Sequence, residues 1–243
     1  MNISTHYYYI IVNIGCFIVP FLFSFHPRLR FYRHWKAFGA GTMVMAAVFI
    51  PWDMYYTAKG IWGFNDKYIS GSYIGNLPLE ECLFFFCIPY ACIYTYHCFS
   101  IFLETRKIPR FFYYLGWGLA ALCIVTAAIY HNRAYTLVTH LLCAVLLLLH
   151  LCVFKSAYLG KFLLVFMVLL VPFLTSNGVL TGTTFWQYPF INLDPDAIAE
   201  PIVWYDNAHN LGVRIWTMPV DDLSYGLTML LLTVTVYERM LRK

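Results

Sequence analysis

The chain has 243 residues, of which 61% are hydrophobic and only 12% are charged, whereas about a quarter of the residues in a soluble domain are charged. This composition excludes an ordinary soluble domain and predicts an integral membrane protein. The net charge of +4 comes largely from short loops between apolar runs, where membrane insertion explains it, so we expect no nucleic-acid partner.

Seven apolar runs are long enough to cross a bilayer, which takes about 20 helical residues. We therefore expect an all-α, polytopic membrane helix bundle of about seven transmembrane helices. No short charged segment precedes the first run and no small-residue cleavage site follows it, so we interpret it as a span rather than a removed signal peptide. The predicted spans are approximately residues 7–25, 36–56, 79–103, 111–130, 135–154, 159–176 and 219–238.

The charged residues are distributed unevenly between the two sides of the predicted bundle. Twelve lysine and arginine residues follow spans one, three, five and seven, and four lie on the opposite side. The positive-inside rule then predicts an outer N-terminus and a cytoplasmic C-terminus. Ten of the twelve acidic residues lie at or beyond the outer ends of the spans, and only Glu104 and Glu238 lie inside. This asymmetry indicates that the outer face carries the chemistry.

A stretch of sequence occurs twice. Residues 71–81 align without gaps on residues 212–222, and the glycine, isoleucine, proline and both acidic residues coincide. Upstream, Pro51 corresponds to Pro172, and an aromatic loop follows each proline. We therefore expect a first repeat over residues 1–106, a linking transmembrane helix over 107–132 and a second repeat over 133–243. The linking helix restores a parallel relation between two three-helix units, so both acidic motifs reach the same leaflet.

The repeated motif ends in two adjacent acids, Glu80 and Glu81 in the first copy and Asp221 and Asp222 in the second. One interpretation is structural, because proline and acidic residues both suit the first turn of a helix. A functional interpretation is favoured, because ionisable groups are costly in membrane helices and are functional candidates there. Successive helical residues also point about 100° apart, so one acid of each pair can face the bundle interior.

Carboxyl groups in an apolar cavity can hold a proton near neutral pH, and two such groups can act as donor and base. Asp53, at the outer end of the second span, is a further candidate, although it could equally be a simple interfacial carboxylate. Arg214 could pair with an acid or contact a lipid phosphate. The high aromatic content suits the stabilisation of a cation by ring faces.

Several other chemistries lack their sequence patterns. No dinucleotide-binding strand–glycine–helix unit occurs, the histidines lack clustered spacing, and the seventh span has no lysine for a retinal Schiff base. The eight cysteines never occur in C-x-x-C spacing and are interpreted as apolar filler. We therefore expect neither a cofactor nor a metal ion.

The motifs together resemble the fused form of the heterodimeric lycopene cyclases, small membrane proteins that occur in bacteria and fungi. The resemblance covers essentially the whole chain and is strongest in the third and seventh spans. The motifs that carry it are Pro51-Trp52-Asp53, the loop 60–64, Leu77 to Phe85, Pro201 to Tyr205, Arg214 and Pro219-Val220-Asp221-Asp222.

The resemblance implies a proton-initiated, non-redox closure of an acyclic carotenoid end group to a β- or ε-ring. It implies that Glu80, Glu81, Asp221 and Asp222 form the acidic centre, with Glu80 as the proton donor and Asp221 and Glu81 as base or neighbouring acid. Phe84, Phe85, Trp62, Asp53 and Arg214 are supporting candidates. This chain has two aspartates where the family often has glutamate and aspartate, and Tyr225 and Gly226 where aromatic residues are frequent, which leaves open whether one or both pairs are catalytic.

The implied partners are lycopene or a related acyclic carotenoid and membrane lipid, and the location implied is a bacterial cytoplasmic membrane. A homo-oligomer stays open. Two alternatives remain at this point. One is a carotenoid hydratase, which shares the protonation step, and the other is a non-catalytic carotenoid-binding membrane subunit.

Overall fold

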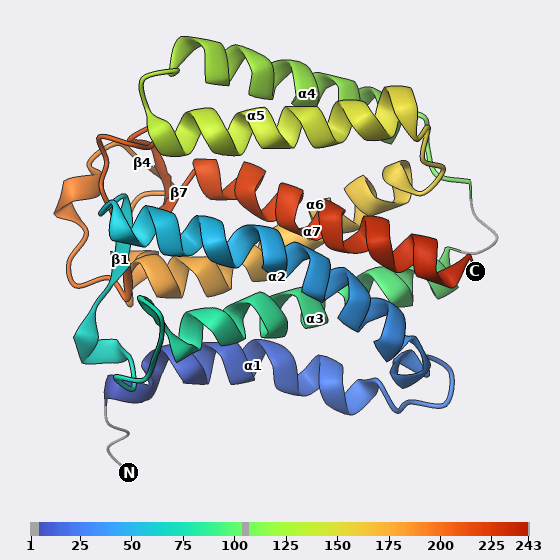
Figure 1. The fold of residues 1–243 in the computed structure, drawn as a ribbon, viewed down its shortest axis with the longest axis horizontal. Helices are drawn as coiled ribbons and strands as arrows, with labels where there is room; N and C mark the ends of the chain where they lie inside the picture. The colour runs from blue at the N-terminus through green and yellow to red at the C-terminus, as the bar shows by residue number, and fades with distance from the viewer. Residues whose placement is uncertain (1–4, 104–106, 243) are drawn as a thin grey trace.

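The computed structural model describes residues 5–103 and 107–242, so three residues that entered the charge count, Glu104, Arg106 and Lys243, lie outside the described residues. Within these ranges, seven α-helices run along one common direction, with short strands in the loops at one end (Figure 1). The predicted all-α bundle is confirmed. The helices are α1 (Tyr8–Phe23), α2 (Trp35–Ala58), α3 (Leu79–Phe102), α4 (Phe111–Ile129), α5 (Ala134–Leu148), α6 (Leu159–Thr181) and α7 (Asp221–Leu241).

Six of the described helices, α1 to α6, are long and apolar enough to cross a membrane, and the chain is therefore an integral membrane protein. The seventh predicted span, α7, is helical but less apolar. It lies between α5 and α2 in the middle of the bundle (Figure 1), and most of its residues are buried. Its threonine hydroxyls bond to carbonyls one turn back, as from Thr233 to Met229, so these polar groups need no other partner there.

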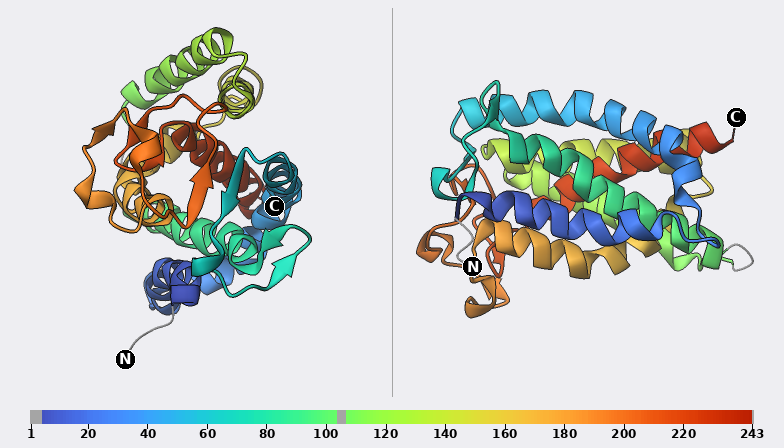
Figure 2. Two further views of the ribbon diagram at one scale, coloured as in Figure 1. Left: turned by 90° about the vertical axis from the view of Figure 1, so that its left-hand side faces the viewer. Right: turned by 90° about the horizontal axis from the view of Figure 1, so that it is seen from below.

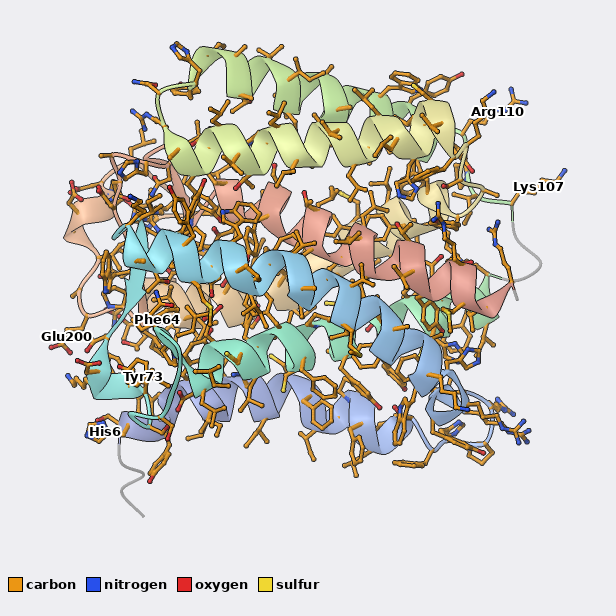
Figure 3. All side chains as sticks on the ribbon, in the orientation of Figure 1. His6, Phe64, Tyr73, Lys107, Arg110 and Glu200 are labelled. Atoms are coloured by element: carbon orange, nitrogen blue, oxygen red, sulfur yellow. The ribbon has the colours of Figure 1, made fainter. Side chains whose placement is uncertain are left out.

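The two ends of the bundle differ in charge, as the sequence predicted. Lys107 and Arg110 lie at one end, and Glu200 lies among the loops at the other (Figure 3). The acids Glu80 and Asp221 begin their helices at the Glu200 end. The acidic motifs therefore share one end of the bundle.

The sixth helix is longer than predicted. The sequence indicated an end near residue 176, where polar residues begin, but α6 continues to Thr181. The hydroxyls of Thr175 and Ser176 donate to the carbonyls of Val171 and Pro172, at 2.8 and 2.9 Å. Because these side chains satisfy their hydrogen bonds within the helix, the polar stretch does not end it. The extension carries Asn177 into the site described below.

The loops at the acidic end form three small antiparallel sheets, which cap the bundle (Figure 2, left). The first pairs one strand from each half of the chain, β1 with β5. The others are hairpins directly before α3 and α7, the second joined by β4 from the longer loop. The strands are β1 (Trp62–Phe64), β2 (Tyr73–Ile74), β3 (Leu77–Pro78), β4 (Ile191–Asn192), β5 (Val203–Tyr205), β6 (Arg214–Ile215) and β7 (Met218–Pro219).

Hydrogen bonds in the two halves of this cap correspond at the same offset of 141 residues that relates the sequence motifs. In the first hairpin Tyr73 pairs with Pro78, and in the second hairpin Arg214 pairs with Pro219. In the shared sheet, the bond from the Asn65 N–H to the Ile202 carbonyl becomes the bond from the Asp206 N–H to the Ile61 carbonyl, both at 2.9 Å. The central register pair, Gly63 with Trp204, maps onto itself, as at a local two-fold axis.

The packing of α2 on α7 is close because of one glycine. A Cβ atom at Gly41 would lie 2.7 Å from the Thr233 carbonyl oxygen, whereas a Cβ at Gly39 would meet nothing within 4 Å. Only glycine at position 41 allows the two backbones to approach this far. This contact fixes the helix that carries Asp53 against the helix that carries Asp222.

Candidate active site

A cavity lies at the acidic end of the bundle, between six of the helices and directly beneath the strand pair β1–β5. Its empty space is about 540 Å³, including the part open to the surroundings. Phe64 marks its loop side in Figure 3. The wall consists of Tyr9, Asp53, Trp62, Phe64, Glu81, Phe84, Tyr135, Phe173, Asn177, Leu180, Val203, Tyr205, Asp222, Tyr225, Gly226 and Met229.

One acid of each sequence pair faces this cavity. Glu81 and Asp222 occupy the first turns of α3 and α7, and both line the cavity wall. Each carboxylate accepts a hydrogen bond from a tyrosine at the start of a neighbouring helix, Glu81 from Tyr9 on α1 and Asp222 from Tyr135 on α5, the latter at 2.6 Å. The two halves of the chain therefore contribute the same acid–tyrosine unit.

Asp222 has more hydrogen-bond donors than Glu81. Besides Tyr135, the side-chain amide of Asn177 donates to its Oδ2 at 3.0 Å, and the hydroxyl of Tyr205 donates to the same oxygen at 3.1 Å. Donors of this kind stabilise the charged form of a carboxyl group. Glu81 has Tyr9 as its one donor among the described residues. The arrangement thus favours the carboxylate at Asp222 over the carboxylate at Glu81.

Tyr205 remains a hydrogen-bond donor because of its surroundings. Burial and the nearby charge of Asp222 raise the pKa of Tyr205 well above its ordinary value of 10.0. The Arg214 guanidinium lies 5.2 Å from the centre of the Tyr205 ring and partly opposes this shift. The hydroxyl therefore keeps its proton over the ordinary pH range and continues to bond to Asp222.

Asp53 is the third acid of the cavity. It is only 3% exposed, and its Oδ1 accepts a 2.5 Å hydrogen bond from the indole N–H of Trp62. Its Oδ2 is buried and has no hydrogen-bond partner among the described residues. A charged carboxylate with one donor is costly in such a place, and the neutral acid is favoured. An O–H at Oδ2 would face no protein acceptor and would be available to a bound molecule.

The other acid of each pair holds a loop instead. Glu80 accepts a 2.8 Å hydrogen bond from the Ser70 N–H, and Asp221 accepts a 3.0 Å hydrogen bond from the Leu211 N–H. Each partner lies ten residues before its acid, and the two contacts correspond at the offset of 141. Neither side chain is part of the cavity wall. Asp221 also accepts a 2.6 Å hydrogen bond from the Thr136 hydroxyl. Both acids therefore hold a loop, and the second oxygen of Glu80, Oε2, is buried without a hydrogen-bond partner among the described residues.

The supporting candidates also divide between the cavity and its surroundings. Trp62 and Phe84 line the cavity, whereas Phe85 is buried in the helix core. Arg214 lies behind Tyr205, and its guanidinium donates to the Thr217 carbonyl and to the side chain of Asn207. It orders the loop around Tyr205 and does not enter the cavity wall.

Sequence reasoning missed several polar residues of the site, namely Tyr9, Tyr135, Asn177 and Tyr205. Tyr9 and Tyr135 could have been found, because each lies in the first turn of a helix that packs beside a helix with an acidic pair. These helices are α1, beside α3, and α5, beside α7. Tyr205 lies in the motif Pro201 to Tyr205, but its contact with Asp222 depends on the register of β5, and Asn177 gave no signal because the end of α6 was not predictable. Tyr225, at the place where the sequence departs from the family pattern, also lines the cavity.

Four aromatic rings surround the acids. Trp62 and Tyr135 have ring centres 5.1 Å apart, and Tyr205 lies 6.1 Å from Trp62 and 6.0 Å from Tyr135. Tyr225 lies 6.4 Å from Trp62. Such ring faces attract a cation by their quadrupole, and the effect is larger when the cation is away from water. The site can therefore hold a proton donor, two further carboxyl groups and a developing positive charge.

The fold and the site define a polytopic membrane protein with an acidic, aromatic cavity at one end of its helix bundle. The chain belongs to the lycopene cyclase family, since the family model described as lycopene cyclase matches residues 6–99 and 132–240. Membership implies an enzyme that acts on a carotenoid. Searches of curated proteins and of solved structures found no match.

Proposed function

We propose that the protein is an isomerase that closes the acyclic end group of lycopene, or of a related carotenoid, to a β-ring without redox chemistry. The observation that carries this proposal is the placement of Asp53, Glu81 and Asp222 in one aromatic cavity with unequal numbers of hydrogen-bond donors. An ε-ring would arise from the same cation if a different proton were lost.

Asp53 acts as the proton donor in this proposal. Its buried Oδ2 has no protein acceptor, so its proton can add to the terminal double bond of the substrate, leaving a tertiary cation. The neighbouring double bond attacks this cation and forms the ring bond, which moves the positive charge into the ring. Loss of a ring proton then forms the final double bond. One proton enters and one leaves, so the mass of the carotenoid is unchanged.

Glu81 takes up the proton that leaves: it starts as a carboxylate while Asp53 holds the one proton of this pair, and with fewer donors than Asp222 it is the more basic carboxylate. Transfer from Glu81 to Asp53 restores the starting state. Asp222, held as a carboxylate by Tyr135, Asn177 and Tyr205, stabilises the cation throughout by its fixed charge. The aromatic rings contribute to the same stabilisation.

Glu80 and Asp221 are positioning residues in this assignment, which differs from the sequence expectation that Glu80 donates the proton. Their hydrogen bonds from the backbone N–H groups of Ser70 and Leu211 hold the loops that lead into α3 and α7. We further propose that residues 1–106 and 133–243 are two copies of one unit joined by 107–132. The corresponding hydrogen bonds of the cap support this division. The acidic face is proposed to be the outer face of a bacterial cytoplasmic membrane.

Expression in cells that accumulate lycopene tests the proposal. The expected product has the mass of lycopene and the absorption spectrum of a cyclic carotenoid. A product heavier by one water would instead indicate a hydratase. Unchanged lycopene with the protein demonstrably present would contradict catalysis and favour a non-catalytic carotenoid-binding subunit.

A further inference from the structure

A second, apolar cavity opens between α1, α3 and α6. Seen from below, α1 lies between α3 and α6 (Figure 2, right), and the three helices contact one another. The empty space is about 570 Å³, including the part open to the surroundings. We call this cavity the lateral groove, and it is lined by Cys16, Pro20, Ile88, Ala91, Cys92, Thr95, Leu169, Pro172, Phe173 and Ser176.

The lateral groove adjoins the candidate active site, and Phe173 lines both cavities. At its far end the groove shares Cys92 and Leu169 with a smaller apolar cavity that reaches Phe162. The three cavities therefore follow α6 from Asn177 to Phe162, which is about 22 Å at 1.5 Å per residue.

The helix crossing beside the groove, α6 on α3, differs from the corresponding crossing in the other half, α2 on α7. The offset of 121 residues that relates Pro51 to Pro172 takes Gly41 to Phe162, and the offset of 141 takes Thr233 to Cys92. Gly41 lets α2 pack closely on Thr233 of α7. At the corresponding crossing of α6 and α3, Phe162 and Cys92 line a cavity. A large ring in place of a glycine keeps these helices apart, which leaves space for an apolar molecule between them.

A small residue also positions Phe173. A Cβ atom at Gly226 would lie 3.0 Å from the tip of the Phe173 ring, so the ring packs directly on the backbone of α7. This places Phe173 at the junction between the acids and the groove. A ring at the junction can separate the reacting end of a molecule from its apolar remainder.

We propose that the lateral groove binds the polyene chain of the carotenoid while one acyclic end group lies in the acidic cavity, with Phe173 at the boundary. This inference rests on the proposed function and names the binding site for the rest of that substrate. Three features point to a polyene as the occupant. The groove is lined mainly by apolar side chains, it forms with the two neighbouring cavities a path of about 22 Å along α6, and this path leads to acidic groups that suit a reacting end group and not the end of a lipid acyl chain.

The test fills the groove and leaves the acids intact. Ala91→Trp places a large ring in the groove, and Ala121→Trp places the same ring on an exposed alanine of α4 as a control. Each purified protein is given lycopene and a short analogue that keeps the acyclic end group but lacks the polyene. Carotenoid retained through purification from lycopene-accumulating cells is measured by its absorbance.

We expect Ala91→Trp to lower lycopene conversion and retained carotenoid by about tenfold or more and to leave conversion of the short analogue near that of the wild type. Ala121→Trp should change none of these. Unchanged lycopene conversion and carotenoid retention in Ala91→Trp would overturn the proposal and leave the groove to lipid. If Ala91→Trp converts neither substrate, Thr95→Phe, which fills the same groove with a smaller ring, is judged by the same two results.

Failure of the proposed function would give a different pattern. In that case the wild-type protein converts neither lycopene nor the short analogue. Carotenoid retention still decides the groove, because a loss in Ala91→Trp that is absent in Ala121→Trp supports binding there, and equal retention in all three proteins contradicts it.

Discussion

Glu81 and Asp222 occupy corresponding positions in the two halves of the molecule, but their surroundings differ. Each is the second acid of its helix and accepts a bond from a tyrosine of a neighbouring helix. Asp222 has two further donors, Asn177 and Tyr205, and both come from the second half. The first half instead contributes Asp53 on α2, an acid whose surroundings favour its neutral form.

One site thus arises from two similar but unequal units. The position of Asp53 corresponds, at the offset of 121, to Leu174 in α6, so the third acid has no partner in the other half. The first half thus provides the groups that exchange protons, and the second half provides a fixed negative charge. The two halves make one composite site rather than two equal ones.

Removing the acid that has no counterpart should have the largest effect. Asp53→Asn keeps the hydrogen bond from Trp62 but has no proton to donate to an alkene. We expect a loss of about 10²- to 10⁴-fold in turnover, the usual contribution of a general acid. Lycopene conversion by equal amounts of purified protein measures it. Activity within a few-fold of the wild type would remove Asp53 from the donor role.

The fixed charge of the second half is tested by Asp222→Asn, which keeps the size of the side chain and removes the charge. We expect a loss of about 10²- to 10³-fold, because the cation loses its electrostatic partner. Asp221→Asn is the matched control, since the neighbouring acid holds a loop and lies outside the cavity wall. Equal losses in the two variants would contradict the division between cavity and loop acids.

The donors of Asp222 can be separated from its charge. Tyr205→Phe removes one of three hydrogen bonds and should lower turnover about tenfold, as expected for a bond worth roughly 1.5 kcal/mol to a charged group. Because the pKa of Tyr205 is raised, the hydroxyl stays neutral to a higher pH than an ordinary tyrosine. The ratio of wild-type to variant activity should therefore stay constant from neutral pH to about pH 9. A ratio that falls as the pH rises would show that Tyr205 ionises in this range.

A substitution at the close crossing of α2 and α7 should have the smallest effect on activity but a measurable effect on stability. Gly41→Ala forces α2 away from Thr233 and should lower the free energy of unfolding by about 1–3 kcal/mol, the usual cost of overpacking. Gly39→Ala, two residues away, meets nothing within 4 Å and should not destabilise the protein. Denaturant unfolding in detergent compares the two. Equal stability of both variants would contradict the close contact at Gly41.

The sequence predicted the bundle, the common end of the acidic motifs and the candidates Asp53, Glu81, Asp222, Trp62 and Phe84, because apolar runs and repeated motifs are local signals. Which acid of each pair faces the cavity was not predictable. Two adjacent residues point about 100° apart, but the rotation of a helix in a bundle depends on packing with distant segments. The end of α6 was missed because the hydroxyls of Thr175 and Ser176 form their hydrogen bonds within the helix, and the role of Tyr205 was missed because it depends on packing against α7.

In the proposed mechanism Glu81, the second acid of the first pair, takes part in the chemistry and Glu80, the first, does not. Glu81→Gln and Glu80→Gln test it directly, because both keep a hydrogen-bond acceptor and differ only in which carboxyl group is lost. With both variants present at wild-type levels, Glu81→Gln should lose nearly all lycopene conversion, while Glu80→Gln should keep most of it. Loss of conversion in Glu80→Gln with activity retained in Glu81→Gln would contradict the account and return the proton donor to Glu80.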